Sequence, residues 1–543
     1  MLDAMIEVEP PPPWLVHQHV FSFCLDQCNI WQASKDSRRG HFRGSERLNR
    51  EGMPVTIRST TVCNAVQLKI PMTLGMLTPA EVATIREKGP YTEDYRLMLH
   101  PLEPACVKQQ LDLGFDEMLQ PLRELAGEEL NEETIVRALH ERPPPPVNGR
   151  SEMDFLPTIP DCDTKAFKDV FRFHPILLAR CALTMLVMVV TGDGQLVEIL
   201  RACKVRWPSQ FKHILIGNGY FHSFVHFLFA LHQGFWKCCL ATFACWLHKD
   251  KQIYEHFKDL THDNAKHCID FHRVVSAACT AFLLLDVQHP SPATLLSDPS
   301  LYAAQVQHDS GTVILELLRH VEAPAIRYKK AIRTRRGSVL RHLVAYSIHV
   351  HRSVAHKPKE VLIMLTTLAG LCCAHPKLQM VLEFSFAVSL LGHIFSAFDH
   401  LLETINNLQL KRSTAFRGYD SQLHFTEYLK PLLHVDACWK LADAGVDLCD
   451  DGIPVYLYND VAELRRKLVE IVGTDLTVKS GNVLWFTGNA VSIYLDDYRE
   501  RMPWVWIWEV AFGRSAGLGR PAKRATTWRR YTMRFIERFL FHC

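Results

Sequence analysis

The chain has 543 residues, too long for one ordinary domain, and predicts about two to four. Its hydrophobic share of 48% and charged share of 22% are globular proportions, which exclude a wholly disordered or fibrous chain. The net charge of +3 implies no partner by itself. The 17 scattered cysteines favour an intracellular reducing compartment, nuclear or cytoplasmic, over a secreted disulfide scaffold.

The N-terminal segments are expected to supply the first part of an α/β core. Residues 1–16 contain a run of four prolines and should form an extended lead-in to the core segment 17–75. The apolar run Val20–Leu25 predicts a short buried strand that ends at Asp26. Thr60–Ile70 alternates weakly and is a candidate second strand.

A helical segment with a proline-rich linker is predicted for residues 76–150, and the second part of the core for 151–250. Thr78-Pro79-Ala80-Glu81 is typical of a helix start. Leu183–Val190 is an unbroken apolar run, typical of a fully buried parallel strand, and it closes on Gly192-Asp193-Gly194. A helix should follow at 196–204, and residues 213–248 predict a strand, a glycine-rich turn and a long buried helix.

The rest of the chain is expected to be mainly helical and locally basic. We assign 251–395 to a helical insertion, 396–500 to a third-acid helix with a helical or mixed region, and 501–543 to a basic, aromatic tail. Seven basic residues without an acid predict contacts with a DNA backbone. They are Arg327, Lys329, Lys330, Arg333, Arg335, Arg336 and Arg341. The alternative is a merely solvated face.

Two features have competing structural explanations. Phe224–Leu247 is apolar and long enough to span a bilayer, but its internal histidines and Lys237 disfavour hydrocarbon, so a buried protein helix is preferred. Cys238, Cys239, Cys245 and His248 could be combined into a metal site, although small buried side chains are the better explanation. The motifs of zinc fingers, zincins, P-loop NTPases and α/β-hydrolases are absent from the sequence.

Three acids form the strongest candidate site. Asp26 and Asp193 each follow an apolar run, and Glu403 lies on a probable helix, FDHLLETIN. Two carboxylates at the ends of neighbouring strands, with a third from a helix, suit an RNase H-like site that binds two Mg²⁺ or Mn²⁺ ions about 4 Å apart. Acids at strand ends are also common in ordinary turns.

Four stretches resemble a family of transposon-derived eukaryotic proteins with an RNase H-like, DDE-type transposase core, catalogued as a domain of unknown function. They are FCLDQCNIWQASKDSRRGHFR with RSTTVCNA, then VVTGDGQLVEILR, ILIGNGYFHSFVHFLFALHQGFW, and FDHLLETINNLQLKR. Together they span about residues 17–412 in the family's order. The resemblance implies a mixed-sheet RNase H-like core with a large helical insertion between the second and third acids.

Carried onto this sequence, the family pattern implies a catalytic and metal-binding triad of Asp26, Asp193 and Glu403. It also implies supporting roles for Asn29, His222, Asp399 and Asn406. The first site reads Asp-Gln-Cys-Asn where the family has Asp-Asn, and the second reads Gly-Asp-Gly-Gln, one residue longer than the pattern.

The function expected from this resemblance is a transposase-derived nuclease that acts on DNA phosphodiesters with Mg²⁺ or Mn²⁺. The implied partners are DNA and a second copy of the chain, with no membrane and no small-molecule cofactor. The alternative is a domesticated, catalytically inactive protein that binds DNA or chromatin. A helical membrane protein is the third possibility.

Overall fold

The structure of the protein is a computed structural model that describes part of the chain. The described residues are 20–33, 47–48, 54–67, 77–91, 95–125, 130–140, 152–159, 169–171, 174–175, 187–247, 257, 265–353, 357–388, 395–405 and 455–478. For residues 20–33, 47–48, 54–67, 152–159 and 402–405, and at a few further positions, only the backbone is described. The basic tail 501–543, Asn406 and His248 lie outside the described residues.

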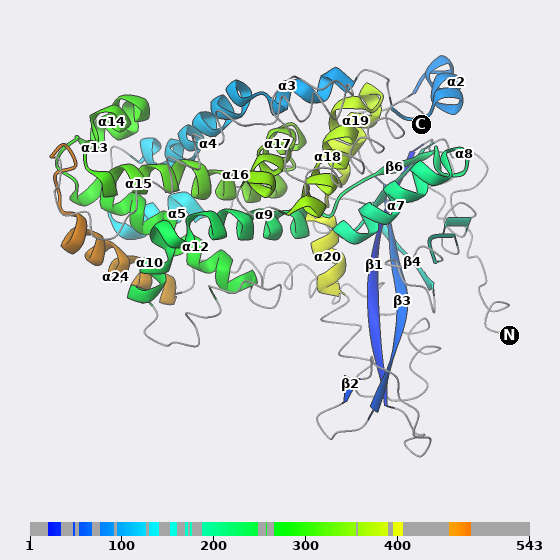
Figure 1. Cartoon of the computed structure of the whole chain (residues 1–543), viewed down its shortest axis with the longest axis horizontal. Helices are drawn as coiled ribbons and strands as arrows, with labels where there is room; N and C mark the ends of the chain where they lie inside the picture. The colour runs from blue at the N-terminus through cyan, green and yellow to red at the C-terminus, as the bar shows by residue number, and fades with distance from the viewer. Residues whose placement is uncertain are drawn as a thin grey trace, which may run out of the picture.

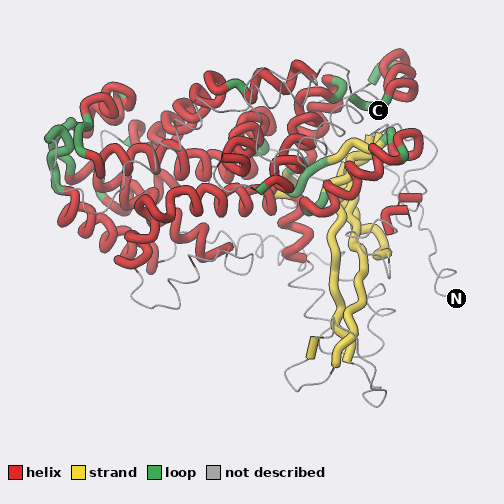
Figure 2. The backbone as a smooth tube through the Cα atoms, viewed as in Figure 1, coloured by secondary structure: helices red, strands yellow, loops and turns green. Residues whose placement is uncertain are grey.

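Helices make up most of the described chain (Figures 1 and 2). The first group comprises α2 (Pro79–Lys88), η2 (Tyr95–Met98), α3 (Leu99–Leu102), α4 (Pro104–Glu124) and α5 (Glu132–His140). The next group comprises α7 (Gly194–Arg206), α8 (Pro208–Phe211), α9 (Tyr220–Phe235), η3 (Trp236–Leu240), α10 (Ala241–Leu247), α12 (Ala265–Ala281), η5 (Phe282–Asp286), α13 (Pro292–Ser297) and α14 (Pro299–Gln305). The last group comprises α15 (Asp309–Leu317), η6 (Leu318–Glu322), α16 (Ala323–Arg333), α17 (Gly337–Ser353), α18 (Pro358–Cys373), α19 (Pro376–Ser385), α20 (Phe398–Ile405) and α24 (Val455–Val472).

Local sequence signals explain where several of these helices begin. Thr78 and Glu81 form a reciprocal capping box at the start of α2, which confirms the predicted helix start. Asp193 is the N-cap of α7, and its side chain accepts a hydrogen bond from the amide of Leu196. Proline opens α4, α18 and α19, where the missing N–H costs no helical hydrogen bond.

The helical body is built around long apolar helices that are buried on most sides. α9, η3 and α10 run continuously from Tyr220 to Leu247, and the π turn η3 joins the two α-helical parts. In Figure 1, α9 lies below α16 and beside α12, and it contacts both. The buried apolar side chains of these helices form one continuous core. The long buried helix predicted within 213–248 is therefore confirmed. The described residues of 251–395 are mainly helical.

The strands form a mixed sheet beside the helical body. Its members are β1 (Val20–Ala33), β2 (Arg47–Leu48), β3 (Pro54–Gln67), β4 (Glu152–Ile159), β5 (Val187–Thr191) and β6 (Ile214–Ile216). Their order is β2-β3-β1-β5-β6, with β4 paired to β3. β1 is antiparallel to β3 and parallel to β5, and β5 is parallel to β6. β7 (Ala387–Val388) and β8 (Ser396–Ala397) form a separate small pair.

The prediction of an α/β protein with an RNase H-like mixed-sheet core is wrong. The described residues are mostly helical, and the core consists mainly of side chains from helices packed on one another. Among the strands of this sheet, only β5 and β6 have described, buried side chains, and they span five and three residues. β1 and β3 run away from the helices as a long ribbon (Figure 2). The physical reason is that apolar helical runs outnumber apolar strand runs and bury one another.

One strand prediction also needs correction in its length. β1 was expected to end at Asp26, but it continues to Ala33 because its second half pairs with β3, where Asp26 lies opposite Val62. The buried strand predicted over 183–190 is present as β5, whose described residues begin at Val187.

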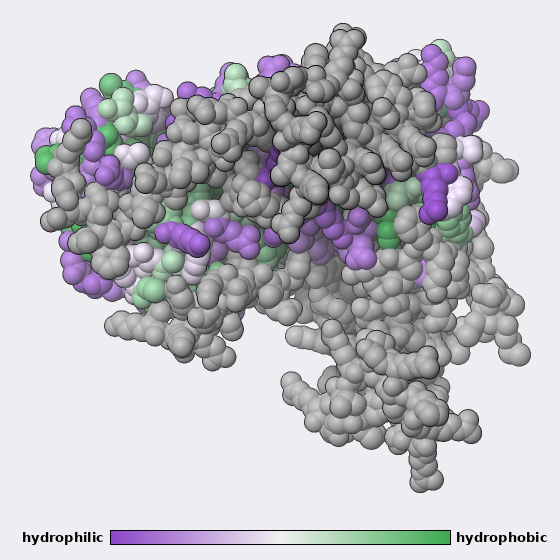
Figure 3. Space-filling model, in the orientation of Figure 1, coloured by the Kyte–Doolittle hydropathy of each residue, from purple (hydrophilic) through white to green (hydrophobic). Residues whose placement is uncertain are grey.

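One helical stretch of the described residues, Ala265–Asp286, is long and apolar enough to cross a membrane. Its most apolar window is 83% buried inside the protein, as in the core helix of a soluble protein, so it is weak evidence for a membrane. On the face drawn in Figure 3, hydrophilic and hydrophobic residues of the helical body are interspersed.

Candidate functional site

The turns that follow β5 and β6 meet at one edge of the sheet. Because the two strands are parallel, their carboxyl ends lie side by side. The amide of Gly217 donates to the carbonyl of Val190, and the amide of Gly219 donates to the carbonyl of Gly192, both at 2.8 Å. A Cβ atom on Gly219 would lie 2.8 Å from the Gly192 oxygen and 2.6 Å from Oδ2 of Asp399. Only glycine permits this close approach.

Asp399 ties α20 to the beginning of α9. Its Oδ1 accepts a hydrogen bond from the amide of Phe221 (3.2 Å), and its Oδ2 accepts from the amide of His222 (3.1 Å). Oδ2 also accepts from Nδ1 of His222 at 2.9 Å. A carboxylate placed at the amino end of a helix is stabilised by the unpaired amides and the helix dipole.

The electrostatics of this pair follow from its burial. The Asp399 side chain is 5% exposed and the His222 side chain 23%. Burial alone would raise the pKa of Asp399, but the hydrogen bonds and charge of His222 and the Phe221 amide outweigh it, so the pKa lies below its usual value. Since an ionised carboxylate only accepts, Nδ1 of His222 carries a proton, and Nε2 is the ring nitrogen not engaged by Asp399.

The ring of His400 adds an apolar contact between α20 and α9. It stacks on Phe221 with 3.9 Å between ring centroids and 11° between planes. Burial lowers the pKa of His400 to about 4, although the charge of Asp399 acts in the opposite direction. His400 is therefore a neutral packing group at neutral pH, and it holds Asp399 against the amino end of α9.

Asp193 lies at the same edge, between β5 and α7. Its Oδ1 accepts from the amide of Leu196 at 2.9 Å, as an N-cap does. Burial raises the pKa of Glu360 on α18, and nearby lysines oppose the rise. The charge of Asp193 is close enough to add to it. Oε1 of Glu360 lies 4.0 Å from Nδ1 of His226. Glu360 and His226 therefore lie close to each other, and Glu360 lies within electrostatic reach of Asp193.

The backbone register brings the other two predicted acids towards this edge. Cys24 of β1 pairs with Thr191 of β5 in parallel, so Asp26 and Asp193 each follow that pair by two residues. α20 packs on both β1 and α9, and Glu403 lies one turn after Asp399 on α20. Asn29 lies further along β1, opposite Ser59. The side chains of Asp26 and Glu403 lie outside the described part. The position of the Asp26 backbone comes from the register of β1, and that of the Glu403 backbone comes from the packing of α20.

The basic cluster that was predicted to bind DNA is largely engaged inside the protein. Arg327 is 8% exposed; its Nε donates to Oε2 of Glu117 (3.0 Å) and its Nη1 to the carbonyl of Gln110 (2.9 Å). Arg333 is also buried. Arg327 therefore binds α16 to α4, because an acid and a carbonyl more than 200 positions away in the sequence meet it in the fold. Neither Arg327 nor Arg333 presents a solvated face.

The remaining members of the cluster differ in exposure. Nε of Arg335 donates to the carbonyl of Phe384, and its guanidinium lies 5.1 Å from the ring centroids of Phe384 and Phe395. Arg341 pairs with Glu383 at 2.6 Å. Lys329 is half-buried, and only Lys330 and Arg336 are exposed. A cavity of about 590 Å³ between α4, α5 and α16 is lined by Arg327, Lys329, Lys330 and Arg333, with Glu117 and Glu124 among the other lining residues.

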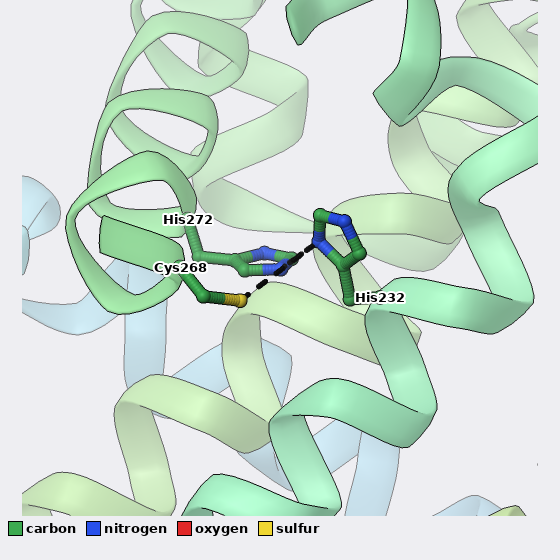
Figure 4. Close-up of side chains that lie close together, drawn as sticks. All are labelled: His232, Cys268 and His272. Carbon is green, nitrogen blue, oxygen red and sulfur yellow. Dashed lines mark hydrogen bonds between the residues drawn. The ribbon is translucent and has the colours of Figure 1, made fainter. Parts of the chain in front are cut away.

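A separate cluster of metal-ligand type lies inside the helical body (Figure 4). His232 of α9 meets Cys268 and His272 of α12, and all three side chains are buried. Nδ1 of His232 lies 3.0 Å from Nε2 of His272 and 4.0 Å from Sγ of Cys268. The three potential ligand atoms lie within 4.8 Å of one another.

Two oxygen atoms extend this buried cluster, one from a carboxyl group and one from a backbone carbonyl. Oε1 of Glu322 lies 2.7 Å from Nδ1 of His272, and the carbonyl of Phe257 lies 3.0 Å from Nε2 of His232. Burial lowers the pKa of His272 to about 3 and lowers that of His232, whereas it raises the pKa values of Glu322 and Cys268. Burial therefore disfavours the charged form of each of these four groups.

This cluster was not predicted from the sequence. The predicted candidate was Cys238, Cys239, Cys245 and His248, of which Cys238 and Cys239 are buried in η3. The available signal was the spacing of Cys268 and His272, four residues apart and so on one face of a helix. Their partner His232 comes from another helix, so spacing alone could not reveal it. Comparisons of the chain with protein-family models, with curated proteins and with solved structures find no match.

Proposed function

We propose that the protein is a nuclease-like, transposase-derived protein that acts on DNA phosphodiesters with divalent cations held by Asp26, Asp193 and Glu403. One observation carries the proposal: β1, the turn between β5 and α7, and α20 meet at one edge, and each of these elements carries one of the three acids. The acids are far apart in the sequence, so only the fold brings their backbones together.

The donor chemistry fits a hard cation. Carboxylate oxygens are the ligands that Mg²⁺ and Mn²⁺ prefer. Asp399 is not a ligand in this proposal, because its two oxygens already accept three hydrogen bonds from the start of α9. When bound, such cations activate a water or hydroxyl nucleophile and stabilise the leaving oxygen.

His222 is the group of the chain best held to move a proton at this edge. Asp399 fixes its ring through Nδ1 and through the backbone amide, which orients Nε2. The partial exposure of the side chain allows contact with a bound substrate. His222 would exchange a proton with the leaving oxygen or with water through Nε2, and Asp399 acts as its positioning residue.

The exposed basic residues would make the contacts with the DNA backbone. Lys330 and Arg336 are exposed, whereas Arg327 and Arg333 are buried, so a smaller set of cations can meet phosphates than the sequence predicted. Phosphate contacts of this kind bind DNA without reading its sequence, and they weaken as salt is added.

The experiment is cleavage of supercoiled plasmid by the purified full chain with Mg²⁺ or Mn²⁺, compared with the same reaction in a chelator. Asp193→Asn should abolish cleavage and leave DNA retention intact. Asp298→Asn is a matched control, because Asp298 also caps a helix and accepts from an amide, that of Leu301, at the same 2.9 Å. Asparagine caps helices as well as aspartate does, so both variants should fold.

The outcomes separate the two main functions. Cation-dependent nicking that is lost in Asp193→Asn and kept in Asp298→Asn supports the nuclease. DNA retention without nicking by the unmutated chain, in every divalent cation tried, refutes it and leaves the catalytically inactive DNA-binding protein.

A further inference from the structure

The strongest unassigned feature of the molecule is the cluster of His232, Cys268 and His272. It lies on α9 ten residues after His222, or about 15 Å along the helix axis. It shares no residue with the edge where the acids meet. We propose that these three side chains form a buried zinc site that joins α9 to α12. This inference does not rest on the proposed nuclease function.

The spacing of the ligand atoms is close to that of a tetrahedral zinc site. Zinc–nitrogen bonds of about 2.0–2.1 Å and a zinc–sulfur bond of about 2.3 Å place two nitrogens about 3.3 Å apart, and a nitrogen and a sulfur about 3.6 Å apart. The distances in the structure are 3.0 Å between the ring nitrogens and 4.0 Å from Sγ of Cys268 to Nδ1 of His232. These two separations differ from the tetrahedral values by about 0.3 and 0.4 Å. The third, between Sγ of Cys268 and the ring nitrogen of His272, is within 4.8 Å.

The partners of the two rings orient them as they are oriented in metal sites. A ligating histidine usually donates its other ring N–H to a carboxylate or a backbone carbonyl, which fixes the ring. Glu322 occupies that position on His272, and the carbonyl of Phe257 occupies it on His232. The two remaining nitrogens, Nε2 of His272 and Nδ1 of His232, point towards each other beside the sulfur (Figure 4).

The charges balance with a divalent ion. A neutral, metal-free cluster has Glu322 donating to His272, His272 to His232, and His232 to the Phe257 carbonyl, with the Cys268 thiol protonated. The three contacts allow this order. With zinc bound, the proton that lay between the two rings is lost, that of Glu322 moves to Nδ1 of His272, and the Cys268 thiol is ionised. Two protons leave as one Zn²⁺ enters, and the carboxylate and thiolate neutralise it, so no net charge is buried.

The donor set selects the metal. Two imidazoles and one thiolate suit Zn²⁺ and disfavour Mg²⁺ or Ca²⁺, which take oxygen ligands. All three side chains are buried, so we expect the ion to be acquired as the helices pack and to stabilise their packing.

The test is the zinc content of the full chain, purified without a metal column or chelator and measured by mass spectrometry, in the Asp193→Asn background so that the acidic edge contributes nothing. We expect about one zinc per chain, and loss of it in Cys268→Ser. Cys203→Ser is the matched control, because Cys203 is equally buried but lies on α7. Glu322→Gln keeps the three ligands and should weaken zinc retention against a competing chelator by about 10- to 100-fold.

A folded Asp193→Asn chain that contains no zinc would overturn the proposal, and so would a Cys268→Ser variant of it that keeps as much zinc as Cys203→Ser. If Cys268→Ser does not fold, the parent chain is produced with Co²⁺ instead. Bound cobalt must then show a thiolate-to-metal charge-transfer band in the near ultraviolet. Cobalt without that band refutes the site, and the cluster is then only a neutral hydrogen-bonded chain.

Discussion

Replacement of Asp399 by asparagine tests how the beginning of α9 is held. The carboxylate accepts three hydrogen bonds, two from the backbone amides of Phe221 and His222 and one from the His222 ring. An asparagine has one accepting oxygen, and its amide nitrogen would face a donor. Whichever way the amide turns, a donor at the amino end of α9 loses its partner.

The size of the effect follows from these contacts. A buried donor without an acceptor costs about 1–3 kcal/mol. Loss of a buried negative charge at a helix amino terminus costs about 1–2 kcal/mol more. We expect Asp399→Asn to lower the local free energy of unfolding of α9 by about 2–5 kcal/mol in total, from the sum of these two contributions.

The loss should depend on pH in a defined direction. The pKa of Asp399 is lowered from 3.8 in the folded chain. A depressed acid pKa gives stability that is fully present above the unfolded pKa and is lost as the pH falls through the folded pKa. The difference between the unmutated chain and Asp399→Asn should therefore be constant near neutral pH and shrink below about pH 4, where the unfolded carboxyl gains its proton first.

Hydrogen exchange of the amides at the start of α9 is the assay. Because 1.4 kcal/mol corresponds to a factor of ten, these amides should exchange about 30- to 4,000-fold faster in Asp399→Asn at pH 7. Asp298→Asn is the control: Asp298 is exposed and accepts one amide hydrogen bond, so its change should be under about 0.5 kcal/mol. Equal exchange in Asp399→Asn and the unmutated chain would refute the role of Asp399 in holding α9.

Three further predictions concern Gly219, Lys204 and the basic cluster. Gly219→Ala should destabilise the chain by about 1–3 kcal/mol, seen as a lower thermal midpoint, because the new methyl would meet Asp399 and the Gly192 carbonyl; an unchanged midpoint would contradict the close approach. Lys204→Met should cost at least about 3 kcal/mol in urea unfolding, because the buried Nζ donates to three carbonyls, with a shortest distance of 2.6 Å; a neutral result would show that they have other donors. The double variant Lys330→Ala and Arg336→Ala should reduce the log–log slope of DNA retention against salt by about 0.9 for each lost contact, and leave the thermal midpoint unchanged. Arg327→Ala should lower the thermal midpoint, because Arg327 is buried. The reverse pattern would contradict the exposures of these residues.

The sequence predicted elements well where the signal was local. The capping box at Thr78 and Glu81, the apolar run of β5, and the turn and long helix after β6 depend on neighbouring residues, and all are present. The balance between sheet and helix could not be predicted in the same way. It depends on which apolar surfaces cover one another across the whole chain.

The candidate sites also differ in whether they depend on neighbouring residues or on contacts between distant segments. Asp193 follows the strand signal of β5 and caps α7, and His222 follows the glycine-rich turn and lies in the first turn of α9. The burial of Arg327 depends on Glu117, 210 residues away, and the zinc-type cluster depends on a partner from a second helix. Contacts between distant segments leave no periodic pattern in a single sequence, so these features required the structure.

The most direct test of the central claim is affinity cleavage by iron. Fe²⁺ replaces Mg²⁺ at carboxylate sites and, with ascorbate and peroxide, generates hydroxyl radicals that cut the polypeptide backbone within a few ångströms. If one cation site is built from β1, the turn after β5 and α20, the unmutated chain should be cut near residues 26, 193 and 403 together, and Asp193→Asn should lose all three cuts. Cuts at only one of these positions, or three cuts that persist in Asp193→Asn, would contradict a shared site.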